Sequence, residues 1–223
     1  MADQQLLDLF SQEPDFSNFI AAGNEIIVSG LQNFATQFTH IYGAHLAGKT
    51  HLLKAWTNLA EAKGKSSVYI DVSELDNDFL DAVKSGLYRF IAIDNIDLAS
   101  EEGQIIIFDI FNYIRLNHVD SYLLTSACKN LTSANLREDL KTRIYSGMVF
   151  NLKSLSDEEL MNALLVYTKR EGIKFGEGEL NYLLKNYTRN LGLLIALINK
   201  VSQIALVEKK NITIPLLKSC MVE

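Results

Sequence analysis

A glycine-rich segment near the amino terminus has the residue types and spacing of a phosphate-binding loop. Residues 43–50 read Gly-Ala-His-Leu-Ala-Gly-Lys-Thr and fit the pattern G-x-x-x-x-G-K-[ST]. Glycines let the backbone curl so that its amides and a helix N-terminus point at phosphate oxygens. Lys49 would place a charge on the β- and γ-phosphates, and Thr50 would offer its hydroxyl to Mg²⁺. The predicted nucleotide-binding residues of this segment are Gly43, Ala44, His45, Leu46, Ala47, Gly48, Lys49, Thr50 and His51.

A second candidate lies where a short apolar run ends in an acid. Residues 90–93 read Phe-Ile-Ala-Ile and are followed by Asp94, which would hold the water shell of the magnesium ion at the end of a strand. Asn95 comes next, at a position where most related P-loop ATPases carry a second acid. An amide can orient an attacking water but cannot accept its proton, so we expect slow intrinsic hydrolysis. The alternative is that Asp94 caps the next turn.

The elements that must position these residues can be predicted from the sequence pattern. The phosphate-binding loop follows the apolar run 38–42 and leads into a helical pattern over 51–60. Alternation of strand-like runs with helical patterns predicts an α/β fold, in which a parallel sheet is sandwiched by helices. The other β-branched or aromatic runs are 67–72, 88–94, 122–126 and 148–152.

The last third of the chain has the pattern of helices. Strand signals stop there, apart from one short pair left open near Ile212. Ser156 and Glu159 have the spacing of a capping box, which predicts the start of a helix. Two more helices are expected at about 177–185 and 189–207. The expected parts are a tail over residues 1–13, a nucleotide-binding α/β domain over 14–153 and a small helical lid domain over 154–223.

The composition disfavours several classes of protein. With 223 residues, 48% of them hydrophobic, the chain can bury a core without cross-links. Two distant cysteines disfavour a disulfide framework, and four histidines form no pair with zinc-site spacing. A net charge of −6 disfavours direct attraction to DNA. We find no apolar run of about 18 residues and no secretory signal, and therefore expect a soluble cytoplasmic protein without a membrane partner.

Together the motifs resemble the DnaA-related AAA+ family of bacterial replication proteins, and most closely its Hda branch. The resemblance covers almost the whole chain and rests on residues 15–19 and 23–24, on 48–53 and on 93–96. The Hda branch often has asparagine where Asn95 stands. The resemblance implies an AAA+ module that binds ADP or ATP, contacts the initiator DnaA, and forms a homodimer or an AAA+ oligomer.

The segment 136–148 is similar to the family's box VII, whose last arginine acts as a finger in the nucleotide site of a neighbouring subunit. By this match Arg143 would act catalytically in trans, on the ATP bound to DnaA, where a guanidinium neutralises charge on the γ-phosphoryl oxygens. The alternative is that Arg143 is a surface residue in a local ion pair with Glu138 or Asp139.

A sensor 1 strand is expected from the family, and it matches imperfectly. Residues 123–126 resemble it, but Ala127 and Cys128 replace the usual Asp-Arg. Thr125 and Ser126 remain as the polar candidates, and Thr125 is the predicted nucleotide contact.

A nucleotide contact from the lid is also expected. The family places an arginine where this sequence has Gly192. Arg189, three residues earlier and on a neighbouring part of the expected helix face, is the candidate substitute. The alternative is a solvated arginine.

The amino-terminal segment carries apolar residues ahead of the predicted domains. Residues 5–10 read Gln-Leu-Leu-Asp-Leu-Phe and resemble the hexapeptide with which bacterial replication proteins dock onto the β sliding clamp. In that match Gln5 forms a hydrogen bond with the clamp, and Leu9 and Phe10 fill an apolar pocket, with Leu6 also in contact. The alternative is an N-terminal helix that packs on the chain's own core.

These resemblances imply a regulator of bacterial replication initiation. The tail would bind the DNA-loaded clamp, and Arg143 would promote hydrolysis of the ATP bound to DnaA. Because no basic recognition helix follows Pro215, DNA would be reached only through other proteins. Two other hypotheses stay open. One is a DnaA-family adaptor or helicase-loader-like assembly switch, and the other is an autonomous P-loop ATPase or small-molecule kinase, against which Asn95 argues.

Overall fold

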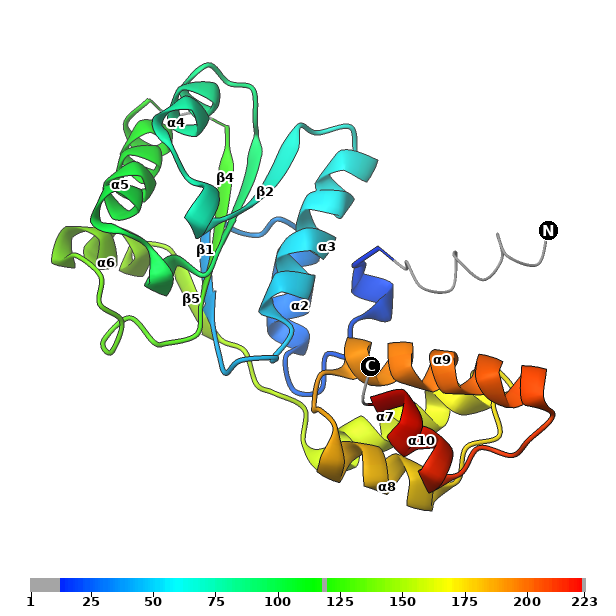
Figure 1. The fold of residues 1–223 in the computed structure, drawn as a ribbon. Helices are drawn as coiled ribbons and strands as arrows, with labels where there is room; N and C mark the ends of the chain where they lie inside the picture. The colour runs from blue at the N-terminus through cyan, green and yellow to red at the C-terminus, as the bar shows by residue number, and fades with distance from the viewer. Residues whose placement is uncertain (1–12, 118–119, 222–223) are drawn as a thin grey trace. The chain divides into compact units, whose positions relative to one another are not determined.

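The computed structural model describes residues 13–117 and 120–221, which form two compact units. The first unit ends at Ser154 and contains strands and helices, and the second begins at Leu155 and is helical (Figure 1). The predicted fold class, a parallel α/β domain followed by a small all-helical lid, is confirmed.

A five-stranded sheet forms the centre of the α/β domain. Its strands are parallel and lie in the order β2-β3-β4-β1-β5. The carboxyl ends of parallel strands meet at one edge of a sheet, which brings together residues from distant parts of the chain. The strands are β1 (Phe38–Tyr42), β2 (Ser67–Asp71), β3 (Phe90–Asp94), β4 (Tyr122–Ala127) and β5 (Met148–Asn151).

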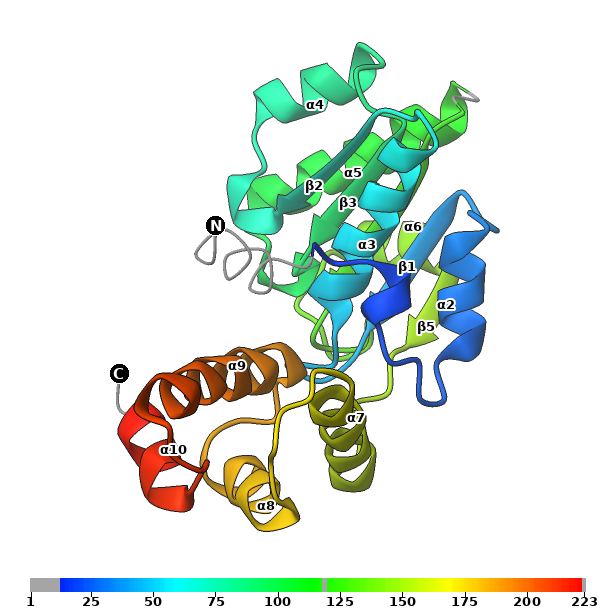
Figure 2. The same cartoon turned by 90° about the vertical axis from the view of Figure 1, so that its right-hand side faces the viewer.

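Helices cover both faces of this sheet, as Figures 1 and 2 show. One face carries α2 (Glu25–Gln32) and α3 (Lys49–Ala62). The other face carries α4 (Asn77–Lys84), α5 (Glu101–Leu116) and α6 (Glu138–Tyr145). Three short 3-10 helices complete the domain: η1 (Phe16–Asn18), η2 (Val72–Glu74) and η3 (Ile96–Leu98).

Side chains on the strands alternate between the two faces, because neighbouring residues on a strand point in opposite directions. In β3, Ile91 and Ile93 pack in the cluster with α4, α5 and α6, whereas Phe90 and Ala92 pack in the cluster with α2 and α3. All four are buried, as expected of a parallel strand covered on both sides. Asp94 continues the second series, so its carboxylate lies on the α3 side at the end of the strand.

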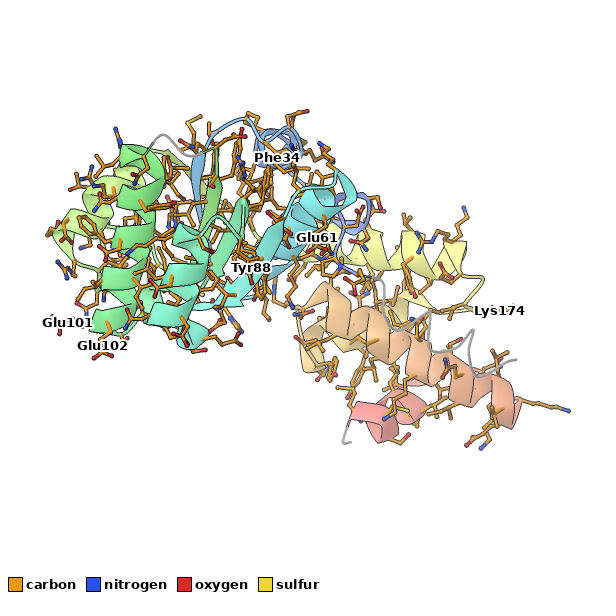
Figure 3. The ribbon with its side chains drawn as sticks, turned by 90° about the horizontal axis from the view of Figure 1, so that it is seen from above. Phe34, Glu61, Tyr88, Glu101, Glu102 and Lys174 are labelled. Atoms are coloured by element: carbon orange, nitrogen blue, oxygen red, sulfur yellow. The ribbon has the colours of Figure 1, made fainter. Side chains whose placement is uncertain are left out.

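An aromatic cluster anchors α3 near the amino ends of the central strands. The ring of Phe34, which is labelled in Figure 3, belongs to this cluster. It lies 4.6 Å from the ring of Phe90 and 5.9 Å from that of Trp56 in α3, centroid to centroid. Phe90 stacks on Tyr122 at 4.8 Å. The ammonium of Lys63 lies 4.6 Å from the centre of the Phe34 ring. These contacts hold α3, and with it the loop that precedes α3, on the sheet.

The lid contains four helices among the residues described. The Ser156 hydroxyl accepts a hydrogen bond from the Glu159 amide at 3.2 Å, and the Glu159 carboxylate accepts one from the Ser156 amide at 2.7 Å, which confirms the predicted capping box. The lid core includes Leu164, Leu180 and Ile198. Its helices are α7 (Asp157–Arg170), α8 (Glu177–Asn186), α9 (Leu191–Glu208) and α10 (Ile214–Met221).

Helix α10 corrects the expectation of a short strand pair near Ile212. Residues 214–221 are helical, with Pro215 in the first turn. Proline is tolerated there because the first amides of a helix have no partner within the helix. The β-branched residues near Ile212 favour a strand by local propensity, but burial of Leu217 and Cys220 in the lid core favours the helix.

Helix α9 corrects the expectation that the chain has no long apolar run. It spans 18 residues with a mean hydropathy of 1.6, and it is the one helix in residues 13–117 and 120–221 that is long and apolar enough to cross a membrane. Its Leu194, Leu197, Ile198 and Val201 are buried in the lid core. The core helix of a small helical domain meets the same criteria of length and composition.

A buried histidine lies in the centre of the sheet. His40 in β1 has an exposed fraction of 1%. Its Nδ1 lies 2.8 Å from the hydroxyl oxygen of Thr125 in β4, and its Nε2 has no hydrogen-bond partner in the described part of the chain. Burial disfavours the charged imidazolium and lowers the pKa of His40 to about 4.

Acid should therefore destabilise the α/β domain through His40. The unfolded chain binds a proton at this residue below pH 6.5, whereas the folded chain binds it only near pH 4. The stability that depends on the neutral imidazole is complete above pH 6.5 and is lost as the pH falls towards 4, by up to about 3 kcal/mol. Urea unfolding followed by circular dichroism across this range measures the loss. The variant His40→Gln should show a shallower pH dependence, and an unchanged slope would contradict the assignment.

Candidate functional site

The loop between β1 and α3 is built so that only glycine fits at its two ends. A β-carbon on Gly43 would lie 2.5 Å from the carbonyl oxygen of Leu152. Gly48 has a φ of +95°, and a β-carbon there would lie 2.8 Å from Cε2 of Phe19. Both glycines of the motif are thus required by close packing, and the backbone path into α3 is fixed.

Lys49, the first residue of α3, places a buried ammonium inside this loop. Its exposed fraction is 5%, and its Nζ donates to the carbonyl oxygens of Gly43 and Ala44, each at 2.9 Å. Gly48 is the N-cap and no side chain caps the helix. Unpaired amides at a helix start and a nearby ammonium attract an anion. The arrangement fits a polyphosphate.

Asp94 is the fully buried carboxylate beside this loop. Its Oδ2 accepts hydrogen bonds from the Thr50 hydroxyl at 2.6 Å and the Tyr69 hydroxyl at 2.9 Å. Its Oδ1 accepts from the Asn95 amide at 3.0 Å and from the Ser126 hydroxyl. The structure thus brings Thr50 and Asp94 into contact. A hydroxyl and a carboxylate suit a Mg²⁺ ion that keeps most of its ligands as water and phosphate.

Tyr69 is a member of this site that sequence reasoning missed. Burial, together with the nearby charge of Asp94, holds the pKa of Tyr69 well above its usual range, so the phenol stays a neutral donor. The ammonium of Lys54 lies 4.8 Å from the centre of its ring. The alternation of side chains along a strand could have identified this residue, because Tyr69 and Asp94 both lie on the α3 side of neighbouring strands.

Asn95 adopts a left-handed backbone conformation with a φ of 59°. Asparagine tolerates this region better than most residues. Its Nδ2 donates to Oδ2 of Asp71, at the end of β2, at 2.7 Å. Asp71 was also missed, because nothing in the local sequence indicates that β2 and β3 are neighbours. The alternative role of Asp94, as a cap of the next turn, is not observed, because η3 has Asn95 as its N-cap and no side chain caps it. Oδ1 of Asp94 accepts from the adjacent Asn95 amide, and Oδ2 accepts from Thr50.

The two polar candidates on β4 point to opposite faces. Thr125 is buried on the α5 side, where its hydroxyl pairs with His40. Ser126 is buried on the α3 side and bonds Asp94. Of these two, Ser126 is therefore the hydroxyl that the structure brings to Asp94. The role of Thr125 as a nucleotide contact stays a prediction, and its hydroxyl is directed away from Asp94.

The remaining loop residues differ in exposure. Ala44, His45 and Leu46 are exposed, and Leu46 has a positive φ of 65°. Ala47 is half-buried and packs against the core beneath α3. His51, in the first turn of α3, directs its Nε2 to the carbonyl oxygen of Asp15 at 3.0 Å. Its ring thereby binds the segment that precedes α2.

Arg143 lies in the last turn of α6, on the face of the sheet opposite α3. Its guanidinium carbon lies 5.6 Å from the centre of the Phe108 ring in α5, and the residue is half-buried. The flat guanidinium is thus supported by an aromatic face and remains partly open to solvent.

The acids proposed as local partners of Arg143 have other partners. Glu138 pairs with Lys141 at 2.8 Å, and Asp139 pairs with Arg137 at 2.7 Å. Among the described residues no ion pair of Arg143 is observed. The local ion pair with Glu138 or Asp139 is therefore absent from this conformation.

Arg189 does not lie on a helix, contrary to expectation. Asn190 caps α9 by accepting from the Leu193 amide at 3.0 Å, so the helix begins at Leu191 and Arg189 falls in the connection from α8. The Arg189 guanidinium pairs with Asp157 at 2.5 Å and donates to the Leu155 carbonyl oxygen at 3.2 Å. It therefore bridges the starts of α7 and α9.

The predicted clamp-binding residues Gln5, Leu6, Leu9 and Phe10 lie outside the described residues.

Comparison with known proteins identifies the lid. Residues 157–221 match the family model described as Hda, lid domain. A protein of Haemophilus influenzae, itself described as uncharacterized, is 26% identical over 213 residues, which cover 92% of this chain and 91% of that protein.

Solved structures share the fold of most of the chain. Domain III of DnaA from Thermotoga maritima has a TM-score of 0.74 at 21% identity, over 96% of this chain and 99% of that one. AMPPCP-bound DnaA from Aquifex aeolicus has a TM-score of 0.68 at 20% identity, over 89% and 67%. Residues 157–221 are thus similar to the Hda lid domain, and the chain has the fold of DnaA domain III.

Proposed function

We propose that this protein is a regulator of bacterial replication initiation that binds an adenine nucleotide and promotes hydrolysis of the ATP bound to DnaA. The position of Arg143 carries the proposal. Arg143 lies shortly before Met148 in the chain, and Met148 pairs with Thr39 at the amino end of β1. The loop 43–48 follows the opposite, carboxyl end of that strand. The sheet separates this guanidinium from the chain's own loop, so Arg143 is available to a neighbouring subunit.

The nucleotide would be ADP or ATP with Mg²⁺. The loop and the amino end of α3 would hold the phosphates, Lys49 would supply the point charge, and Thr50 and Asp94 would hold the ion with its waters. A DnaA of the same fold is bound to the ATP analogue AMPPCP, which supports an adenine nucleotide. Asn95 cannot take a proton from the attacking water, so hydrolysis by the chain alone would be slow.

Arg143 would act in the nucleotide site of ATP-bound DnaA. Negative charge spreads over the γ-phosphoryl oxygens as phosphoryl transfer proceeds, and a guanidinium can hydrogen-bond two of these oxygens at once. In GTPases an arginine supplied in trans raises the rate by roughly 10³ to 10⁵. The Phe108 ring restricts the guanidinium before docking, which lowers the entropy lost when the two proteins associate.

The amino-terminal segment and the net charge of the chain suggest further partners. Residues 5–10 would bind the β sliding clamp on DNA and so concentrate the protein at replicated DNA. The net charge of −6 supports contact with DNA only through other proteins. We place the protein in the cytoplasm without a membrane partner, and we expect AAA+ contacts with DnaA or with a second copy. The Hda lid match supports DnaA as the partner.

Changing Lys49 to Ala should abolish tight nucleotide binding and leave the fold intact. The buried ammonium is the only side-chain cation bonded to the carbonyl oxygens of the described loop, and its loss should raise the dissociation constant for ADP on the order of 100-fold. Titration calorimetry measures the affinity, and circular dichroism checks the fold. Lys65→Ala, at an exposed position beyond α3, is the matched control. Equal affinity of Lys49→Ala and the control would refute the site.

Changing Arg143 to Ala should remove the stimulation of ATP hydrolysis by DnaA in the presence of clamp on DNA. Nucleotide binding by the variant should remain normal, because Arg143 lies across the sheet from the loop. Arg137→Ala on the same segment, where the arginine is paired with Asp139, should keep most of the stimulation. Turnover of radiolabelled ATP by DnaA is the measurement. Full stimulation by Arg143→Ala would end the proposal of a finger.

Deletion of residues 1–10 should remove the dependence of this stimulation on the clamp. The deleted protein should still bind ADP, and it should no longer be retained by immobilised clamp in a binding assay. A DnaA-family adaptor or helicase-loader-like switch would need neither Arg143 nor the tail. Stimulation that survives both changes would favour that alternative.

A further inference from the structure

The contact between Asp71 and Asn95 joins the ends of β2 and β3 beside the phosphate-binding loop. Asn95 donates from Nδ2 to Oδ2 of Asp71 at 2.7 Å. The other carboxylate oxygen, Oδ1, accepts from the amide of Ser73 at 3.0 Å and from its hydroxyl at 2.6 Å. The backbone amide of Asn95 donates to Asp94 at 3.0 Å and to the Ser126 hydroxyl at 3.2 Å. Asn95 is thus held at both its backbone and its side chain.

The polarity of this contact fixes the orientation of the amide group. An ionised carboxylate only accepts hydrogen bonds, so the nitrogen of the Asn95 amide must face Asp71. Oδ1 of Asn95 is then the atom left to face water. This oxygen receives no hydrogen bond from residues 13–117 or 120–221. Asp71 and Asp94 are direct partners in the register of β2 and β3, and Asn95 directly follows Asp94, whose carboxylate contacts Thr50.

We propose that Asp71 and Asn95 act as a pair in which the amide stands directly after Asp94, where related P-loop ATPases carry an acid, and the acid stands at the end of β2. The acid therefore lies one strand away from the attacking water. Asp71 is a positioning residue that turns Oδ1 of Asn95 towards that water. The pair would orient the water without accepting its proton, which keeps bound ATP intact. This inference rests on the nucleotide site of the proposed function.

Asp71 is poorly suited to replace the missing base. Burial alone would raise its pKa, but the hydrogen bonds from Ser73 and Asn95 together lower the pKa of Asp71 below its usual range. A weakly basic carboxylate with both oxygens already bonded has little capacity to take a proton from water. The pair would therefore orient the attacking water through Asn95, while neither residue would remove a proton from it.

A purely structural role for Asp71 makes a different prediction. The carboxylate also accepts from the Ser73 amide and so caps the short helix η2. If capping were its only task, replacement of Asp71 would lower stability whatever residue stood at position 95. If it positions Asn95, the effects of changes at the two residues must depend on each other.

The test exchanges the two residues in the full-length protein. Asp71→Asn alone sets two amides together, and Asn95→Asp alone sets two carboxylates together. The double variant, Asp71→Asn with Asn95→Asp, regains one carboxylate-to-amide hydrogen bond and places the acid directly after Asp94. Asp78→Asn, an exposed acid in the first turn of α4, is the matched control. The measurements are ATP hydrolysis under saturating Mg²⁺-ATP, ATP affinity, and the thermal midpoint without nucleotide.

We expect both single variants to have lower thermal midpoints than the wild type, and the double variant to recover most of this loss. The double variant should bind ATP within about threefold of the wild type and hydrolyse it on the order of 10²-fold faster, the scale of a general base. Neither single variant should reach that rate.

Two results would overturn the inference. One is a double variant that binds ATP normally and hydrolyses it no faster than the wild type, and the other is Asn95→Asp alone matching the double variant. If the wild type binds no nucleotide, the proposed nucleotide site fails along with this inference. Stimulation of DnaA, measured on the same proteins, tests Arg143 separately, so its loss would leave the Asp71 result standing.

Discussion

The burial of one carboxylate, that of Asp94, constrains the rest of the site. An ionised carboxylate removed from water is costly unless donors surround it. Its donors are the Thr50 hydroxyl from α3, the Tyr69 hydroxyl from β2, the Asn95 amide after β3 and the Ser126 hydroxyl from β4. These groups meet only when the strands are parallel and adjacent and α3 starts at their carboxyl edge. The loop 43–48 lies beside Asp94 because Thr50, in the first turn of the helix that follows the loop, is bonded to that carboxylate.

The same sheet also divides the polar groups of the domain between two faces. Side chains of opposite parity on one strand cannot reach the same site, so Ser126 bonds Asp94 while Thr125 pairs with His40 on the other side. Arg143 belongs to that second face, where it rests on Phe108. The loop 43–48 and the guanidinium on α6 are thereby kept apart within one chain. This separation is what a contribution to a neighbouring subunit requires.

Local patterns were sufficient for most of the fold. Strand runs such as 38–42 and 122–126 were predicted within a residue or two, because apolar runs bounded by helical patterns are local properties. The Ser156 capping box was likewise a local signal. Local signals were insufficient where packing competes with propensity. Helix α10 forms where a strand pair was left open, and the cap at Asn190 excludes Arg189 from α9.

By itself the sequence determined the composition of the candidate site, because the loop 43–50, the acid Asp94 and the amide Asn95 are each recognised from residues that are contiguous in the chain. The packing that requires the two glycines of the loop comes from Leu152 and Phe19, which are distant in the sequence. Only the tertiary structure decided which distant groups complete that site. Tyr69 and Asp71 are partners of Asp94 and Asn95 because β2 pairs with β3 in one register. Strand order and register depend on the burial of whole faces, which no short segment of sequence encodes.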